Sequence, residues 1–344
     1  MEKSLSKLVS DSLRRFNYFH SLPRTLFSYL TLVLGLRRQP KSDRAMAITF
    51  SVSEDYARVW LYFARKNLPP AKWDVLVVDC SGDIAAGKLP QAHLIRFPNI
   101  SHGEKIDFFL NKFVSSDLVF IGDDDKYLIK DISSLLPMFE NPKLAAISLC
   151  PRNWYKLNIN GETYLPMGSY ALLLKHRLIK NHSLSFKPVK KSTGGVKMFN
   201  PGVKEQDTYD TADYANEQLL RLGYEIKTIE NSDFALGFDG LSAPRIFAKD
   251  RGKDFIRAEL SKAVHYKPGS ISGAQMRGFY GIVKFEKLFQ DIFGENPSFV
   301  VGFSEAELRS IVERNKKISE EDRADILSYF DNLDNIYNRL KVLI

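Results

Sequence analysis

The stretch DLVFIGDDDKYL (residues 117–128) runs from apolar residues directly into three consecutive aspartates. Its apolar part, residues 118–122, is typical of a buried β-strand. Side chains alternate along a strand, so Asp123 and Asp125 should project to one side of the strand end and Asp124 to the other. Two ionised carboxylates on one side of a buried strand end favour a cation between them. Oxygen ligands without nearby thiolates favour Mg²⁺ or Mn²⁺.

The same aspartates have a second interpretation, as an acidic turn that caps a helix beginning near Asp131. Their position favours the metal site. They follow the fourth strand of a β–α series, and open α/β proteins bind ligands at the carboxyl ends of parallel strands.

Short apolar runs alternate with helical patterns from residue 46 onward. Between the runs, EDYARVWLYFARKN (54–67) and EKIDFFLNKFVSS (104–116) place apolar residues on one helical stripe. Ser51–Glu54 and Ser101–Glu104 match the capping box of a helix start. This succession predicts an α/β fold with a mostly parallel sheet and helices on both faces. The expected strands are residues 46–51, 73–79, 93–97, 118–122 and 144–150.

The following segment is less regular. NINGETY (158–164) predicts a hairpin, and KKSTGGVKMFNPG (190–202) a long Gly-rich loop of the kind that is often functional. A helix in DTADYANEQLLRLG (210–223) and a strand in YEIKTI (224–229) come next.

From Ser304 the chain is predicted to be helical, and its last segment carries apolar residues at alternating spacings of four and three. This stripe could form the coiled-coil seam of a homodimer, or one helix packed on its own domain. Its members are Ile326, Phe330, Leu333, Tyr337, Leu340 and Ile344.

The formal net charge of +8 is concentrated at the N-terminus. Residues 1–44 hold nine Lys and Arg against three acids, a net of +6. The apolar segment within them, TLFSYLTLVLGL (25–36), is shorter than the about 20 residues of a membrane span and lacks the cleavage pattern of a secretory signal. A helix lying on an anionic membrane surface and a helix packed on the body of the protein both fit. Nucleic-acid binding is not expected, because no recognised motif accompanies the charge.

The two cysteines, Cys80 and Cys150, lie outside any metal-ligand spacing and indicate buried free thiols. They favour a cytoplasmic protein. Peripheral attachment to the inner face of the membrane would follow if residues 1–44 bind lipid.

A phosphate-binding motif is imitated by GDIAAGK (82–88), which fits G-x-x-x-x-G-K after a strand. Leu89 stands where the Mg²⁺-binding hydroxyl belongs, and Pro90 leaves no room for the helix that would hold the phosphates. We therefore expect a surface turn here. The lack of G-x-G-x-x-G after the first strand argues against a dinucleotide-binding oxidoreductase.

Residues 46 to about 230 resemble glycosyltransferases of the GT-A fold, in particular the family 2-like enzymes with a D-x-D motif. The matching segments occur in the same order: AITFSVSEDYARVWLYFARKNLP, VVDCSGD, GEKIDFFLNKFVSSDLVFIGDDD and DTADYANEQLLRLGYEI. The resemblance implies a GT-A (Rossmann-like) mixed sheet with N- and C-terminal helical extensions. The expected domains are a basic amphipathic extension (1–44), a catalytic domain (45–270) and a C-terminal helical region (271–344).

The resemblance also implies roles for the donor side of the site. Asp79, at the end of the second strand, maps onto the aspartate that contacts the nucleotide base. Lys105 maps onto a basic residue that approaches the diphosphate, and Ser51 is placed with them as a donor-binding residue. The D-x-D motif maps onto Asp123 to Asp125. In a second register Gly122 and Asp124 form the pair, with Asp125 as the following acid and Asp124 as the ligand.

Further residues map onto the acceptor side and the C-terminal return of the family. In VHYKPGSISG (264–273), His265 is a candidate metal ligand and Lys267 a candidate diphosphate ligand. Asp213 is the expected general base and Asp210 the reserve. The chain departs from the family at Cys80, where an acid is common, and it offers only QMRGF (275–279) in place of Q-x-x-R-W.

The resulting prediction is an inverting glycosyltransferase that depends on Mn²⁺ or Mg²⁺. It would move a sugar from a nucleotide-sugar donor, with a UDP-sugar as the first expectation, to a glycan or lipid-linked acceptor. A nucleotidyltransferase of similar fold and a non-catalytic assembly module are the alternatives.

Overall fold

The computed structural model describes residues 5–37, 39, 42–150, 156–159, 161–165, 167–188, 197–199, 211–229, 233–238, 240–241, 271–316 and 318–344. The chain divides into two compact units, Tyr18–Ala235 and Met1–Asn17 with Leu236–Ile344. The predicted domain limits at 44 and 270 stay predictions.

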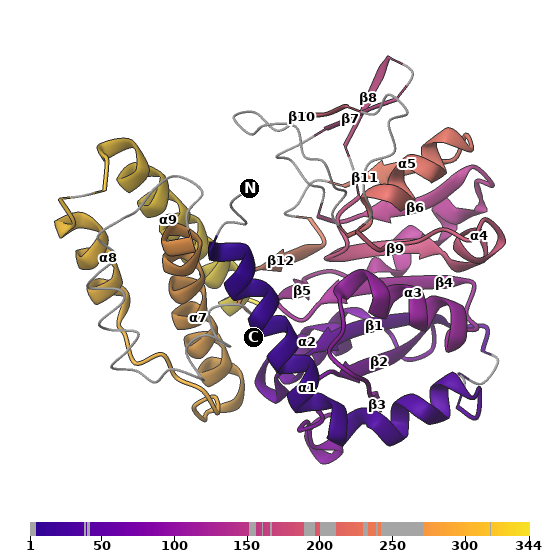
Figure 1. Cartoon of the computed structure of the whole chain (residues 1–344), viewed down its shortest axis with the longest axis horizontal. Helices are drawn as coiled ribbons and strands as arrows, with labels where there is room; N and C mark the ends of the chain where they lie inside the picture. The colour runs from indigo at the N-terminus through magenta and orange to yellow at the C-terminus, as the bar shows by residue number, and fades with distance from the viewer. Residues whose placement is uncertain are drawn as a thin grey trace. The chain divides into compact units, whose positions relative to one another are not determined.

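The first unit is built on a seven-stranded sheet in the order β11-β6-β9-β4-β1-β2-β3 (Figure 1). All neighbours are parallel except β9, which is antiparallel to β4 and β6. The predicted mixed, mostly parallel sheet is confirmed, whereas β9 was not predicted. The strands are β1 (Ala45–Ser51), β2 (Trp73–Asp79), β3 (His93–Arg96), β4 (Leu118–Asp123), β6 (Leu144–Ser148), β9 (Ala171–Lys175) and β11 (Glu225–Thr228).

Helices cover both faces of this sheet, each over its own apolar core. Alternate residues of β1 divide between the two cores: Ala47 faces α2 and the 3-10 helix η2, and Ile48 faces α3, α4 and α5. The end of α1 packs through Leu32 into the core that contains Ile48. The helical elements are α1 (Leu5–Val33), α2 (Glu54–Asn67), η1 (Ala86–Lys88), α3 (His102–Lys112), η2 (Ile132–Glu140), α4 (His176–Asn181) and α5 (Asp213–Arg221).

The chain reverses its direction across the sheet beside β1. From β1 it passes through α2 to β2 and β3 on one side, and then returns through α3 to β4 on the other. Ligands of open α/β sheets bind outside the carboxyl ends of the strands at such a switch point. The register sets Ser51 opposite Asp79 and Phe50 opposite Asp123, so these strand ends share one edge.

Smaller sheets complete the topology. The predicted hairpin in NINGETY is confirmed: β7 (Lys156–Ile159) pairs antiparallel with β8 (Glu162–Tyr164), and β10 (Lys197–Phe199) joins β7. A two-stranded sheet contains β5 (Lys126–Leu128) and β12 (Ala235–Gly237).

The two predicted capping boxes are wrong in detail. Ser51 is still part of β1, so the N-cap of α2 is Ser53, whose side chain accepts from the Tyr56 amide at 3.5 Å. Ser101 is the N-cap of α3, but its hydroxyl donates to the Glu104 carboxylate at 2.7 Å and caps no amide.

In the second unit, α7 (Ile271–Phe293) packs with α8 (Glu305–Arg314) and α9 (Glu320–Lys341). The apolar stripe of α9 faces inward, and Phe330 stacks on Tyr280 with ring centroids 3.9 Å apart. Ile326, Leu333 and Leu340 are also buried within the chain. This burial agrees with the second interpretation of the stripe, a helix packed on its own domain.

Leu333→Asp tests that packing. A carboxylate in this core should lower the free energy of unfolding by about 3 kcal/mol or more, whereas Ile344→Asp at the exposed end of the stripe should change it by about 0.5 kcal/mol or less. Chemical unfolding and light scattering measure the two effects. If the Leu333→Asp variant is as stable as the parent but its particle mass in solution is half that of the parent, the stripe is a dimer seam instead.

Candidate active site

Polar side chains gather at the carboxyl ends of β1, β2 and β4. The Ser51 hydroxyl lies 2.5 Å from Asp124 Oδ2 and 2.9 Å from the Ser53 carbonyl oxygen, and it has one proton to donate. Both Ser51 and Asp124 are buried. The hydrogen bond to Asp124 joins the two strands that flank the switch point.

The three aspartates do not belong to one strand, because β4 ends at Asp123. Asp124 and Asp125 form the turn into β5, so the strand alternation that predicted Asp123 and Asp125 on one side does not extend past Asp123. The Asp123 side chain is 30% exposed, and its Oδ1 lies 3.4 Å from His102 Nε2. Asp125 is buried, and its charge helps to raise the pKa of Tyr127, after burial of that hydroxyl as the main cause.

His102 is a site residue that the sequence analysis missed. It begins α3, its ring meets Phe50 edge-on at 5.6 Å between centroids, and it faces Asp123. The signal was present in SHGE (101–104), because His102 and Lys105 are three positions apart and share one face of the first helical turn.

The Lys105 ammonium is buried, with 6% of the residue exposed. Its Nζ donates to Asn99 Oδ1 at 3.1 Å, lies 3.7 Å from Cys80 Sγ, and sits 5.7 Å from the centroid of the Phe50 ring. Within the described residues no carboxylate forms an ion pair with it. A buried cation without a counter-charge is costly, so this position favours an anionic ligand.

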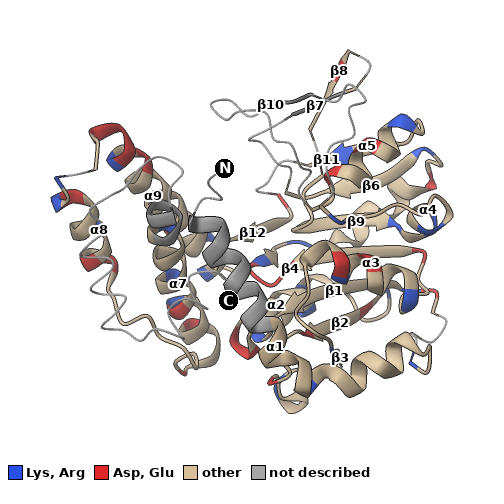
Figure 2. Ribbon diagram, viewed as in Figure 1, with Lys and Arg blue, Asp and Glu red and all other residues tan. Residues whose placement is uncertain are grey.

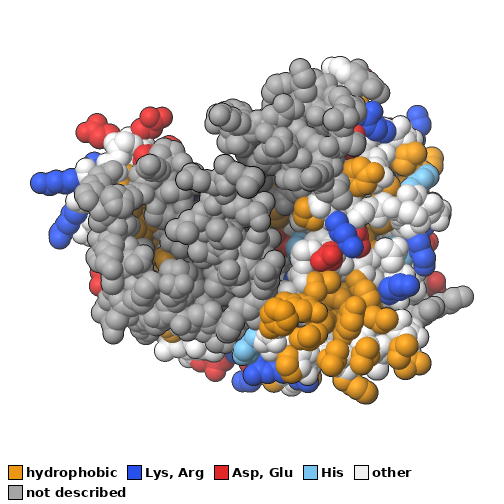
Figure 3. Space-filling model, viewed as in Figure 1, with side chains coloured by type: hydrophobic (Ala, Val, Ile, Leu, Met, Phe, Trp, Pro, Cys, Tyr) orange, Lys and Arg blue, Asp and Glu red, His pale blue; other side chains and the backbone are white. Residues whose placement is uncertain are grey.

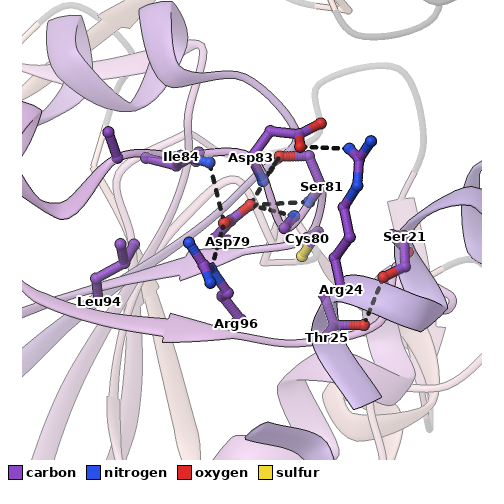
Figure 4. Close-up of polar contacts among 12 residues, drawn as sticks. Ser21, Arg24, Thr25, Asp79, Cys80, Ser81, Asp83, Ile84, Leu94 and Arg96 are labelled. Atoms are coloured by element: carbon purple, nitrogen blue, oxygen red, sulfur yellow. Dashed lines mark hydrogen bonds and ion pairs between the residues drawn. The ribbon is translucent and has the colours of Figure 1, made fainter. Parts of the chain in front are cut away.

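The Asp79 carboxylate organises the loop that follows β2 (Figure 4). Oδ1 accepts from the amides of Ser81 and Gly82 and from the Ser81 hydroxyl at 2.8–2.9 Å, and Oδ2 accepts from the Ile84 amide at 3.1 Å. Asp79 is fully buried, and Arg96 Nε lies 3.7 Å from Oδ2. A carboxylate offers about four lone-pair sites, so these bonds occupy Asp79. Its contact with a nucleotide base stays a prediction, and shaping the loop is the role that its bonds support.

Cys80, the next residue, is a free buried thiol, as is Cys150. Burial raises the pKa of the Cys80 thiol, and the nearby Lys105 charge only partly opposes this. Cys80 is therefore neutral at physiological pH and does not neutralise the ammonium.

The loop after β2 also contacts α1. Arg24 pairs with Asp83 (Figure 4). The backbone of Gly82 approaches Arg24 so closely that an added Cβ would lie 2.5 Å from Arg24 Cβ. Gly82 has φ +79°, which favours glycine as well. On the other side of the site, the backbone amide of Asn99 donates to the Ser21 hydroxyl of α1 at 3.3 Å. The segment 82–88 is a short turn with an exposed tip, which confirms the predicted surface turn.

Asp213, the predicted base, is the first residue of α5 and is fully buried. It follows Ala212, which has φ +73°. Asn216, one turn further, binds the backbone of Met167 through both atoms of its amide, at 2.8 and 3.2 Å. Burial at a helix start agrees with stabilisation by the helix dipole as well as with a catalytic role, so the base stays a prediction. The reserve residue Asp210, together with His265 and Lys267, lies outside the described residues.

The predicted metal site depends on which His, Cys, Asp and Glu side chains lie close together. In the described part of the chain no group of three or more His, Cys, Asp or Glu side chains is arranged to hold a metal ion. Mg²⁺ is commonly held by one or two carboxylates together with substrate phosphates. The partly exposed Asp123 fits that arrangement, in which a metal is completed by the ligand.

Comparisons with known proteins give distant likenesses only. No family model matches the sequence, and no curated protein matches it. Among solved structures, S. aureus TarS 1-349 is 12% identical and covers 86% of this chain and 91% of its own, with a TM-score of 0.38. A CMP:2-keto-3-deoxy-manno-octonic acid synthetase complexed with CTP is 15% identical, covering 63% of this chain and 99% of its own, with a TM-score of 0.38. The bifunctional glycosyltransferase WbbM is 10% identical over 65% of this chain and 45% of its own, with a TM-score of 0.34. With TM-scores this low, the fold class rests on the topology of the sheet itself.

Proposed function

We propose that the protein is a glycosyltransferase that takes a sugar from a nucleoside diphosphate donor. The observation that carries the proposal is the buried ammonium of Lys105, which has no carboxylate partner among the described residues and lies at the switch point of the sheet. A diphosphate supplies two negative charges that such a cation would neutralise. A UDP-sugar is the first donor to test.

The neighbouring groups supply the other parts of a donor site. The loop held by Asp79 offers a rigid edge for the base. The Ser51 to Asp124 hydrogen bond fixes the floor between β1 and β4, which leaves Asp123 as the more exposed carboxylate. His102 lies beside Asp123 in the N-terminal turn of α3, where helix amides favour phosphate oxygens.

We assign Asp123 as the carboxylate that would hold Mn²⁺ or Mg²⁺, with Asp125 as the second residue of the D-x-D motif. A bound metal would neutralise charge on the departing diphosphate. In the register that makes Asp124 the ligand, its carboxylate would bind the metal while it also accepts the hydrogen bond of Ser51. His265 and Lys267 remain proposed contributors.

On the acceptor side we propose Asp213 as the general base, with Asp210 in reserve, and a glycan or lipid-linked acceptor. In an inverting transfer the acceptor hydroxyl attacks opposite the diphosphate and gives its proton to a carboxylate. This assignment rests on the sequence resemblance and on the location of Asp213 in the first turn of α5.

The alternatives predict different products. A nucleotidyltransferase would use a Gly-rich loop after the first strand, whereas here only Val52 and Ser53 separate β1 from α2. It would transfer the nucleotide of a nucleoside triphosphate to a sugar phosphate and release pyrophosphate. A non-catalytic module would leave sugar nucleotides intact. Release of the nucleoside diphosphate from a sugar nucleotide supports the transferase.

Lys105→Met tests the proposed diphosphate contact. Removing an unpaired buried charge should leave the unfolding temperature of the free protein unchanged or raised, while the stabilisation by UDP should be lost. Thermal unfolding with and without UDP measures both effects. Lys112→Met, at the exposed end of the same helix, is the matched control and should keep the UDP effect. Undiminished stabilisation of Lys105→Met by UDP would remove the assignment.

Replacing both Asp123 and Asp125 by Ala tests the metal. The additional stabilisation that Mn²⁺ gives in the presence of UDP should disappear, because the carboxylate ligands are gone, while the fold persists. The same titration with and without a chelator provides the measurement. If Mn²⁺ still strengthens UDP binding to the double variant, the metal is held by other residues.

Asp213→Asn keeps the shape of the side chain and removes its ability to accept a proton. We expect turnover of the sugar nucleotide to fall by ~10²–10⁴-fold, as for loss of a general base, with UDP binding retained. Steady-state release of the nucleoside diphosphate, beside the thermal measurement of binding, separates the two effects. Near-normal turnover in Asp213→Asn and in Asp210→Asn would place the base elsewhere.

A further inference from the structure

From Tyr18 onward, α1 has two apolar faces. The inner face packs on the sheet domain: Thr25 and Leu32 are buried, and Tyr29 meets Phe97 and Phe108 with ring centroids 5.5 and 5.9 Å apart. The sequence alternative of a helix packed on the body of the protein is therefore correct for this face.

The opposite face is exposed to solvent. Of the twelve exposed large hydrophobic side chains among the described residues, seven lie between Phe19 and Leu36. Phe27 is 81% exposed and Leu34 69%. In Figure 3 the orange side chains of this segment form a continuous patch at the lower right. The six on the helix or at its end, spaced by one, three, four or seven residues, are Phe19, Leu26, Phe27, Leu30, Val33 and Leu34.

Along the sequence of this segment charge has one sign, and of its basic residues Arg24 pairs with Asp83 in the loop after β2. Residues 12–42 contain no Asp or Glu but carry six Lys and Arg, which lie on both sides of the apolar stretch. In Figure 2 the described part of the α1 ribbon accordingly has no red, acidic position. Arg37, just after the helix, is exposed and donates to the Leu94 carbonyl oxygen at 3.1 Å. The basic residues that flank the exposed apolar stripe in the sequence, here called the basic rim, match an anionic surface with an apolar layer beneath it.

We propose that the outer face of α1 binds the surface of an anionic lipid bilayer. The helix lies in the plane of the interface, its apolar side chains enter the boundary of the acyl layer, and the flanking arginines meet the headgroups. No helix in the described part of the chain is long and apolar enough to cross a bilayer, which agrees with a helix that lies on the membrane. This inference goes beyond the proposed sugar transfer and does not depend on it.

A second copy of the chain is the competing occupant of this face. Two copies meeting through it would bring like charges of the two basic rims together, which opposes association. An anionic bilayer instead neutralises them, so charge favours lipid.

The experiment uses the full chain with vesicles of phosphatidylcholine alone or mixed with phosphatidylglycerol. We expect sedimentation with the anionic vesicles, weakened by raised salt. Phe27→Glu combined with Leu34→Glu should lower the partition coefficient by about tenfold or more, because both side chains enter the interface. Leu222→Glu, at a 50% exposed leucine on α5's end, is the matched control and should bind as the parent does. Unfolding curves check that the double variant is folded.

A second measurement makes the test independent of charge reversal. Phe27→Trp places a reporter on the outer face. Its emission, taken as the difference from the parent chain with its three tryptophans, should shift to shorter wavelength with anionic vesicles if the residue enters the interface. Three results would each overturn the proposal: no sedimentation of the parent chain, equal binding by the double variant, or concentration-dependent dimerisation that the double variant abolishes. The last result would assign the face to a second copy.

Discussion

Parallel pairing of β1 with β2 on one side and with β4 on the other is the constraint on which the rest of the site depends. It aligns the carboxyl ends of three buried strands, so that Ser51, Asp79 and Asp123 reach the same edge of the sheet. Because the connections leave β1 in opposite directions, this edge is the switch point at which open α/β sheets bind their ligands. Asp123 is partly exposed there, whereas Ser51 and Asp79 are buried in a domain whose strands are enclosed by two apolar cores.

The electrostatics of this edge are uneven. The Asp79 carboxylate accepts four hydrogen bonds and Asp124 accepts one from Ser51. Among the described residues, the contacts of the Lys105 ammonium are the side-chain oxygen of Asn99, a thiol and a ring face. The ammonium lost its water when the domain folded, so a bound anion would supply interactions that the ammonium lacks. Because the cost of removing water from the ammonium is met on folding, it does not have to be met again when an anion binds.

Much of the sheet could be predicted from the sequence, because buried strands and amphipathic helices leave strong periodic patterns. The helix at 54–67 and the strands at 73–79 and 118–122 lie within a residue of the expected positions. Strand β9 was missed, since ALLLK continues directly into α4 without a turn signal and periodicity does not specify antiparallel pairing. The convergence of the predicted donor-side residues followed from strand ends sharing an edge. The individual hydrogen-bond partners of these residues could not be predicted, because they depend on where β4 ends and on how the backbone of the loop after Asp79 turns.

The close contact between Gly82 and Arg24 makes α1 a part of the domain wall as well as a surface helix. One face of α1 holds the loop of Asp79 and, through Ser21, the segment of Asn99, while the other face is exposed. A shortened chain that begins at the first strand would uncover Phe97 and Phe108 and release both loops. Trimming the N-terminus would therefore loosen the loops at the carboxyl ends of the strands, whereas exchanging outward-facing side chains of α1 would leave these contacts in place.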